Sequence, residues 1–117
     1  MLNQLVLVGR ITHDPEPTIL EDGKKVLKFQ IAVQRAFKNY LGEYDTDFFS
    51  ITCWEGLATM VENYITKGVM IAVKGRIQSW KYQLDEKKHL NMIEVIAEKV
   101  TYLESSKERL EKRLQTE

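Results

Sequence analysis

The stretch Val69-Met-Ile-Ala-Val-Lys-Gly-Arg-Ile-Gln-Ser-Trp-Lys-Tyr82 alternates in the manner of a long β-strand. The apolar face would carry Val69, Ile71, Val73 and Ile77. The opposite face would carry Lys74, Arg76, Gln78, Trp80 and Tyr82, with Lys81 adjacent. Since an unpaired cation is costly to bury, this second face should meet solvent. Exposed rings beside cations indicate a surface that stacks bases and neutralises phosphates of a single strand. A solvated edge strand is the alternative.

The residue pattern on both sides of this strand predicts an all-β domain with a single helix. Strands are expected over residues 4–12, 25–37, 47–54, 69–82 and 90–102, and a helix over residues 57–66. Turn residues separate them at positions 13–17, 21–24 and 39–43. Five strands with a helix between the third and fourth is the order of the OB-fold, a five-stranded barrel that binds oligonucleotides.

The predicted helix has one apolar stripe, which a small barrel needs as a plug. The stripe consists of Leu57, Met60, Val61, Tyr64 and Ile65. Gly68 stands where a left-handed C-cap belongs. In the fifth strand, Ile93, Val95 and Ala97 should share one apolar face.

The second and third strands bring more rings toward a surface. Leu27, Phe29, Ile31 and Val33 form a core face. Strict alternation would bury Arg35 as well, so the strand should leave the barrel or bulge before Arg35, which frees Phe37. In the third strand, Phe48 and Trp54 share a face with polar residues, although Trp54 packed under the helix is an equal alternative.

Composition limits the classes of function. The 117 residues suffice for one domain, and 17 basic residues balance 17 acidic ones, which argues against duplex binding through bulk positive charge. Residues 74–88 nevertheless hold five Lys and Arg against two acidic residues. No apolar run is long enough to cross a membrane, and the first residues do not resemble a signal peptide. The single cysteine fits a reducing cytosol.

Catalytic and metal-binding patterns are not found in the sequence. His13 and His89 have no partner at metal-ligand spacing, and Cys53 suits a core position better than a nucleophile. The chain has no phosphate-binding glycine loop and no serine nucleophile elbow. We therefore expect neither an enzyme nor a bound cofactor or metal.

The sequence resembles bacterial single-stranded DNA-binding proteins over roughly residues 1–103. The matching segments are Leu5-Val-Leu-Val-Gly-Arg with Asp14-Pro-Glu, Phe29-Gln-Ile-Ala-Val, Thr46-Asp-Phe-Phe-Ser-Ile-Thr-Cys-Trp, Tyr64-Ile-Thr-Lys-Gly and Val73-Lys-Gly-Arg-Ile. The resemblance implies base stacking on Phe37, Phe48, Trp54 and Tyr82, to which this chain adds Trp80. The cations expected beside these rings are Arg35, Lys38, Lys74, Arg76 and Lys81.

What the resemblance implies is a non-catalytic protein that coats and protects single-stranded DNA, with little sequence preference, during replication, recombination or repair. An OB-fold interaction subunit with secondary nucleic-acid binding is the alternative. Leu5 to Val8 are apolar on both faces, so one face should meet a second subunit, in a homotetramer or a homodimer. A bacterial cytoplasm, at the nucleoid, is the expected location.

Residues 1–103 should form the binding domain, and residues 104–117 a short charged tail that is helical or disordered. Ser105 and Glu108 have the spacing of a capping box. Many members of the family end in an acidic Pro-Phe tip that recruits repair enzymes. This chain ends Arg-Leu-Gln-Thr-Glu, so such recruitment is not expected. A short paralogue, a phage or mobile-element form and a trimmed chain all fit this ending.

Overall fold

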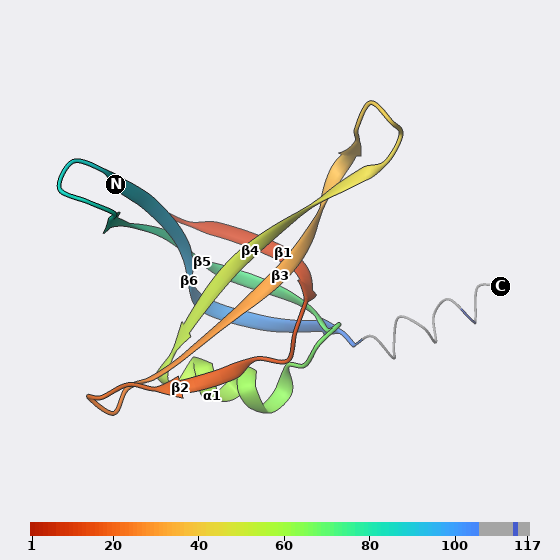
Figure 1. Ribbon diagram of the computed structural model, residues 1–117. Coiled ribbons are helices and arrows are strands. Elements are labelled where there is room, and N and C mark those ends of the chain that lie inside the picture. The colour runs from red at the N-terminus through yellow and green to blue at the C-terminus, as the bar shows by residue number, and fades with distance from the viewer. Residues whose placement is uncertain (106–113, 115–117) are drawn as a thin grey trace.

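The computed structural model describes residues 1–105 and residue 114, and the chain folds as a closed five-stranded barrel with one helix. Its elements are β1 (Leu5–Ile11), β2 (Glu16–Ile19), β3 (Lys25–Lys38), β4 (Tyr44–Trp54), α1 (Glu55–Tyr64), β5 (Met70–Gln83) and β6 (His89–Glu104). The sheet order is β1-β5-β6-β4-β3-β2, and an additional pairing of β1 with β3 closes the barrel. The helix lies between the third and fourth barrel strands, so the predicted OB-fold is confirmed (Figure 1).

The barrel closes through two short contacts between strands. Arg10 and Ile11 at the end of β1 pair with β3, and the parallel pair of β4 and β6 joins Thr52 to Ile96. Where β5 crosses β6, a Cβ added to Gly75 would lie 2.2 Å from the Ile96 carbonyl oxygen. The backbones can approach this closely only because residue 75 has no side chain.

The core fills the barrel with alternate side chains, as the strand patterns predict. Its fully buried members include Ile11, Leu27, Ile31, Ile51, Ile71 and Val73. The helix covers one end through Ala58 and Val61. The tail prediction falls on residues 106–113 and 115–117, which lie outside the described residues.

The predicted helix stripe is correct at Val61 and Ile65 and wrong at Tyr64, which is 71% exposed. The helix ends at Tyr64, and Ile65 enters the core in an extended conformation, so the two residues do not share a helical face. Gly68 has the expected positive φ, +87°. It lies in the following turn, where its N–H donates to the carbonyl oxygen of Ile11 at 2.8 Å instead of capping the helix.

β1 ends at Ile11, ahead of the two prolines as expected, but the chain then forms a short strand, β2, that the sequence did not suggest. Pro17 lies within β2, paired opposite Leu27 of β3. A proline is tolerated here because β2 lies at the edge of the sheet and pairs with β3 alone.

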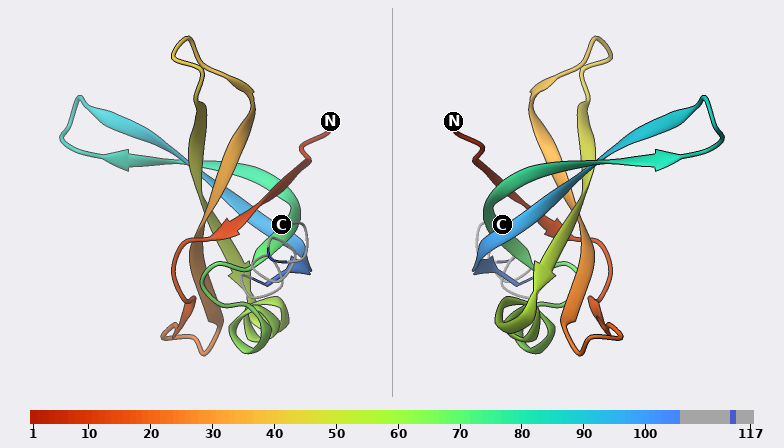
Figure 2. Two further views of the ribbon diagram at one scale, coloured as in Figure 1. Left: turned by 90° about the vertical axis from the view of Figure 1, so that its right-hand side faces the viewer. Right: turned by 90° about the vertical axis from the view of Figure 1, so that its left-hand side faces the viewer.

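Two ribbons continue beyond the barrel and diverge from each other (Figures 1 and 2). We call residues 35–45 the β3–β4 arm and residues 77–93 the β5–β6 hairpin. Ile77 and Ile93 were expected on the core face, yet they are 44% and 68% exposed. Their parity is correct, but the strands have left the barrel at these positions, so no core remains for that face to contact.

The first strand is apolar on both faces, and only one of them is covered within the chain. Leu5 and Leu7 pack against the core, whereas Val6 and Val8 are exposed.

In the described part of the chain, no helix has both the length and the apolar character needed to cross a membrane.

Candidate nucleic-acid interface

The outward surfaces of four barrel strands join into one continuous face. Arg76 of β5 lies opposite Ile96 of β6, Ile96 opposite Thr52 of β4, and Thr52 opposite Lys28 of β3. Side chains directly opposite one another in a sheet share a face. Alternation from this row places Phe48 and Trp54 on the β4 part of the face, and Trp80 and Tyr82 on the β5 part. We call this surface the ring-bearing face.

The predicted rings are open to solvent. Phe37, Phe48, Trp54, Trp80 and Tyr82 are between 40% and 72% exposed. Trp54 occupies the N-cap position of α1 and remains exposed, so the alternative in which it packs beneath the helix does not hold. Ring faces available to solvent are what base stacking requires.

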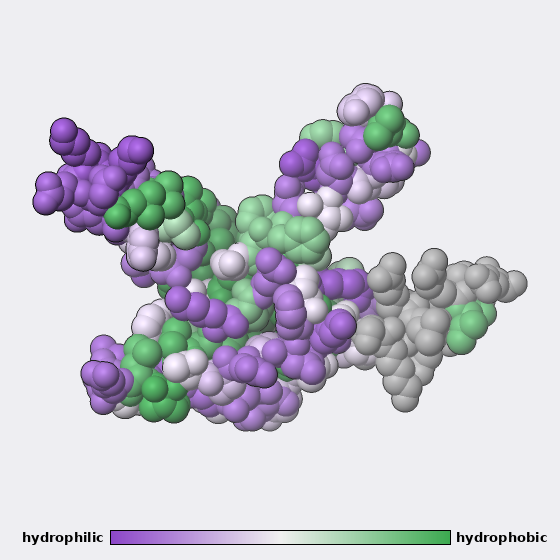
Figure 3. All heavy atoms as spheres, viewed as in Figure 1, coloured by the Kyte–Doolittle hydropathy of each residue, from purple (hydrophilic) through white to green (hydrophobic). Residues whose placement is uncertain are grey.

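The hairpin presents its rings as part of an apolar row. Trp80 lies opposite Met92, and Tyr82 lies opposite Leu90. The rings of Trp80 and Tyr82 meet edge to face, with centroids 6.4 Å apart and planes at 78°. Figure 3 shows apolar side chains along this ribbon, next to a hydrophilic tip. The row is an exposed apolar strip of the kind that marks a binding surface.

The predicted cations do not all lie beside the rings. Arg76 is on the ring-bearing face, where its Nη1 donates to Gln78 Oε1 at 2.8 Å. Lys81 alternates onto the opposite side of the hairpin. Lys74 alternates onto the same side of β5 as Arg76, but it lies opposite Val6 of β1 and Lys99 of β6, farther along the strand from Trp80 and Tyr82. Of these three cations, Arg76 is the one in the row of paired residues that joins β5 to β4.

On the β3–β4 arm, the register shifts between Gln34 and Lys38, and Phe37 projects from this irregular segment. The strand leaves the barrel as predicted, although the shift does not precede Arg35 and extends beyond it. The ammonium of Lys38 lies 5.8 Å from the centroid of the Tyr44 ring, a cation–π contact.

Arg35 is held by carboxylates. Its Nε and Nη2 donate to the two oxygens of Asp47 at 3.0 Å each, and its Nη1 lies 3.7 Å from Asp45. The hydrogen bond from Arg35 lowers the pKa of Asp47, and the same bond raises the pKa of Arg35. The pair therefore stays ionised at neutral pH, and its charges cancel locally.

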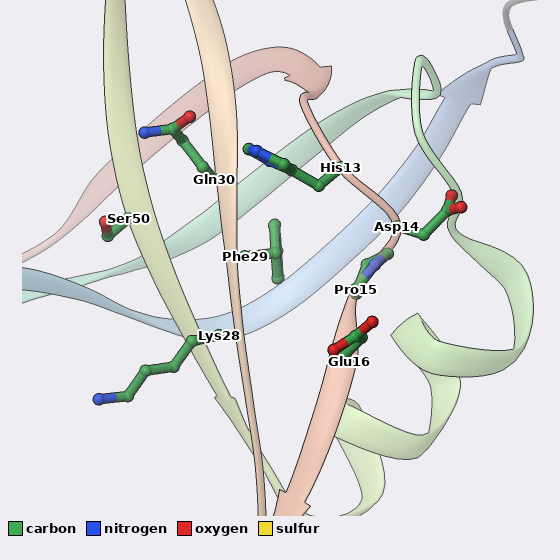
Figure 4. A pocket seen from close by; sticks show the side chains of 8 residues that line it. All are labelled: His13, Asp14, Pro15, Glu16, Lys28, Phe29, Gln30 and Ser50. Atoms are coloured by element: carbon green, nitrogen blue, oxygen red, sulfur yellow. The ribbon is translucent and has the colours of Figure 1, made fainter.

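Sequence reasoning missed three polar residues on the ring-bearing face. Lys28 and Gln30 of β3 and Ser50 of β4 line a pocket beside the connection from β1 to β2 (Figure 4). The outward parity of these residues could have identified them from the sequence. Their contact with the β1–β2 connection could not have been predicted, because nothing local in the sequence shows where that connection passes.

Catalytic chemistry finds little support in the geometry. Burial raises the pKa of Cys53 to about 12, so its thiol is a poor nucleophile at neutral pH. Among the described residues, no three His, Cys, Asp or Glu side chains are grouped so that they could hold a metal ion.

Comparison with known proteins identifies close relatives of the whole barrel. Residues 2–103 match the model of the single-strand binding protein family. A single-stranded DNA-binding protein of Halalkalibacterium halodurans is 43% identical over 104 residues, which cover 89% of this chain and 62% of that protein. Single-stranded DNA-binding protein 3 of Listeria innocua is 41% identical over 105 residues, which cover 90% of this chain and 66% of that protein.

A single-stranded DNA-binding protein of Bacillus cereus is 40% identical over 104 residues, 89% of this chain and 61% of that protein. The chain thus spans less than two thirds of the length of these three relatives.

Proposed function

Because the chain belongs to the single-strand binding protein family, we propose that it is a non-catalytic protein that coats single-stranded DNA with little base preference. The observation that carries the proposal is the ring-bearing face, which holds four half-exposed aromatic side chains and Arg76. Unpaired bases can stack on such rings, whereas the bases of a duplex stack on one another. Protection of single strands in replication, recombination or repair would follow from this coating.

A fluorescence titration tests the proposal directly. Trp54 and Trp80 both lie on the ring-bearing face, so stacking of bases should quench the intrinsic tryptophan emission. Oligo(dT) should quench at far lower concentration than a duplex with the same number of nucleotides. Equal affinity for the two forms would contradict the proposal.

We also propose that the exposed side of β1 is covered by a second copy of the chain, in a homotetramer or a homodimer. Val6 is 63% exposed, and Val8 is exposed next to it on the same face. Burying such a surface against an identical one is favourable, and closed symmetry is the usual result. Light scattering at micromolar concentration should give the mass of an oligomer, and a monomer would contradict this assembly.

Residues 1–103 are proposed as the complete single-strand-binding domain, acting in the cytoplasm at the nucleoid. The segment from residue 106 onward has four Lys and Arg and three Glu, so it adds little net field. Removing that segment should leave affinity for oligo(dT) nearly unchanged. A large loss of affinity would assign the segment to DNA binding or to assembly.

A further inference from the structure

A pocket of about 500 Å³ opens beside the ring-bearing face. Its lining includes His13, Pro15, Glu16, Lys28, Gln30 and Ser50. In Figure 4 the connection between β1 and β2 forms one wall, and β3 and β4 form the other. The volume falls within the range of about 300–1,000 Å³ that is typical of sites for small organic ligands.

The pocket lies on the path that a stacked strand would follow. Gln30 lies directly opposite Ser50, so both side chains share one face of the sheet. Ser50 is two residues after Phe48 and four before Trp54, and alternation places all three on the ring-bearing face. A strand that stacks on Phe48 and Trp54 would therefore pass over the mouth of the pocket.

The polar groups of the pocket are partly preorganised. The hydroxyl of Thr12 lies 3.2 Å from Gln30 Oε1 and 2.5 Å from Nδ1 of His13. Figure 4 shows the His13 ring pointing toward β3, the strand that carries Gln30. Because Thr12 holds Oε1, the Nε2 group is the end of the amide that can donate to a ligand. Within residues 1–105, neither Gln30 Nε2 nor the Ser50 hydroxyl has a hydrogen-bond partner.

The charges favour a neutral ligand over a phosphate. Asp14 and Glu16 stand at the wall of the pocket, and a phosphate would meet these carboxylates. Lys28 is the only lysine or arginine in the lining. A nucleobase is uncharged at neutral pH, and its edge carries carbonyl oxygens that accept hydrogen bonds.

We propose that this pocket is a base-edge subsite, which takes one nucleobase out of the stacked strand. Gln30 Nε2 and the Ser50 hydroxyl donate to a carbonyl-bearing edge, such as that of thymine, while the neighbouring bases stack on Phe48 and Trp54. The subsite rests on the proposed function and adds a contact that reads hydrogen-bonding groups. One such contact among many stacked bases is compatible with a low overall base preference.

The test replaces thymine by difluorotoluene, a ring of the same shape that lacks the carbonyl acceptors. Binding of oligo(dT) is compared with binding of the same oligonucleotide carrying difluorotoluene throughout. The wild-type protein should bind oligo(dT) more tightly, by roughly 5- to 100-fold, as expected for a pair of hydrogen bonds to a base edge. The double variant Gln30→Met with Ser50→Ala should bind the two oligonucleotides equally, with its affinity for the difluorotoluene strand unchanged.

The matched control is the pair Gln34→Met with Thr46→Ala. Gln34 lies opposite Thr46 on the same face of the same two strands, four residues along and outside this pocket. In this control variant, the ratio of the affinity for oligo(dT) to the affinity for the difluorotoluene strand should equal the wild-type ratio. If the control variant also bound the two strands equally, the assignment to this pocket would be overturned. The single variant Ser50→Ala, at an exposed position, serves if Gln30→Met does not fold, and it should reduce the ratio.

The outcomes separate the subsite from the proposed function. Tight binding of oligo(dT) with equal affinity for difluorotoluene, or an unchanged ratio in the pocket variants, would overturn the subsite and leave the function standing. Failure of the wild-type protein to bind oligo(dT) at all would overturn both.

Discussion

Asp47 engages Arg35 through two parallel hydrogen bonds, from Nε and Nη2 to the two carboxylate oxygens, both 3.0 Å long. The third nitrogen of the guanidinium, Nη1, lies 3.7 Å from Asp45 Oδ2. Asn39 Nδ2 donates a hydrogen bond to Asp45 Oδ1 at 3.1 Å. The Nε–Nη2 edge of Arg35, which can make two parallel hydrogen bonds to a carboxylate or a phosphate, is thus already occupied. A DNA phosphate that approaches this edge has to compete with Asp47.

This competition makes Asp47→Asn a gain-of-binding variant. Freeing Arg35 should raise affinity for oligo(dT) and steepen the slope of log affinity against log salt by about 0.7, the value for one more neutralised phosphate on a single strand. The pair is exposed, so the melting temperature should change little. Asp22→Asn is the control, because it removes the same charge at the turn between β2 and β3. Identical salt slopes for the two variants would show that Arg35 does not reach DNA.

Ring variants should weaken binding without changing its salt dependence. Phe48→Ala and Tyr82→Ala each remove a stacking contact worth about 1–3 kcal/mol per base and leave every cation in place. Both side chains are more than half exposed, so the variants should remain folded. Tyr64→Ala is the matched control, because Tyr64 is an exposed ring on α1. Wild-type affinity in the folded Phe48 and Tyr82 variants would rule out stacking there.

Cation variants, in contrast to ring variants, should flatten the slope of log affinity against log salt. Arg76→Ala and Lys81→Ala should each lower it by about 0.7 if the residue contacts a phosphate. The two residues lie on opposite faces of β5, so the pair of variants also maps the path of the DNA strand. An effect at Arg76 alone would confine DNA to the ring-bearing face. No change in either variant would exclude both as phosphate contacts.

Two glycines should respond oppositely to the same substitution. A Cβ at position 75 would lie 2.2 Å from the Ile96 carbonyl oxygen, so Gly75→Ala should destabilise the barrel by about 1–3 kcal/mol. A Cβ at Gly56 meets nothing within 4 Å, and Gly56→Ala in the first turn of α1 should stabilise by about 0.4–1 kcal/mol. Thermal melting checks both. A Gly75→Ala protein as stable as wild type would mean that β5 and β6 separate without cost.

Periodicity predicted the fold well wherever a strand stays in the barrel. Leu27 and Ile31 on one strand, and Ile71 and Val73 on another, are buried as their parity required. The same rule failed at Ile77 and Ile93, because parity assigns a residue to a face but not to a position within or beyond the barrel. Pro17 in β2 shows a second limit, since edge strands obey weaker rules than central ones.

In the candidate site, the exposure of the rings could be predicted from the sequence, whereas the partners of the charged residues could not. Exposed positions for Phe48, Trp80 and Tyr82 follow from alternation alone. The partners of Arg35 depend on the register between β3 and β4, which places Val33 opposite Asp47 and brings that carboxylate within reach. Local sequence does not fix that register. The pocket beside Gln30 was not anticipated, because local sequence does not show that the β1–β2 connection passes next to β3 and β4.

Cys53 should be unreactive in the folded protein. Its side chain is fully buried on the inner face of β4, and burial raises the thiol pKa from its ordinary value of 9.0 to about 12. Because the thiolate is the reactive form, an aromatic disulfide reagent at pH 8 should label the native protein very slowly and the urea-unfolded protein at once. Labelling of the native protein within minutes would mean that the barrel opens readily at β4.

The raised pKa of Cys53 also makes the folded protein less stable in alkaline solution. A group with a raised pKa in the folded state contributes its full stability below the unfolded pKa and loses it as the pH rises through the folded value. Between about pH 9 and about pH 12 the unfolded chain releases the Cys53 proton first, so the melting temperature should drop across this window. Cys53→Ala removes this contribution and leaves every other ionisable group in place. The difference between wild-type and Cys53→Ala melting temperatures should therefore narrow above pH 9, and a difference that stays constant would show that the folded thiol ionises as readily as the unfolded one.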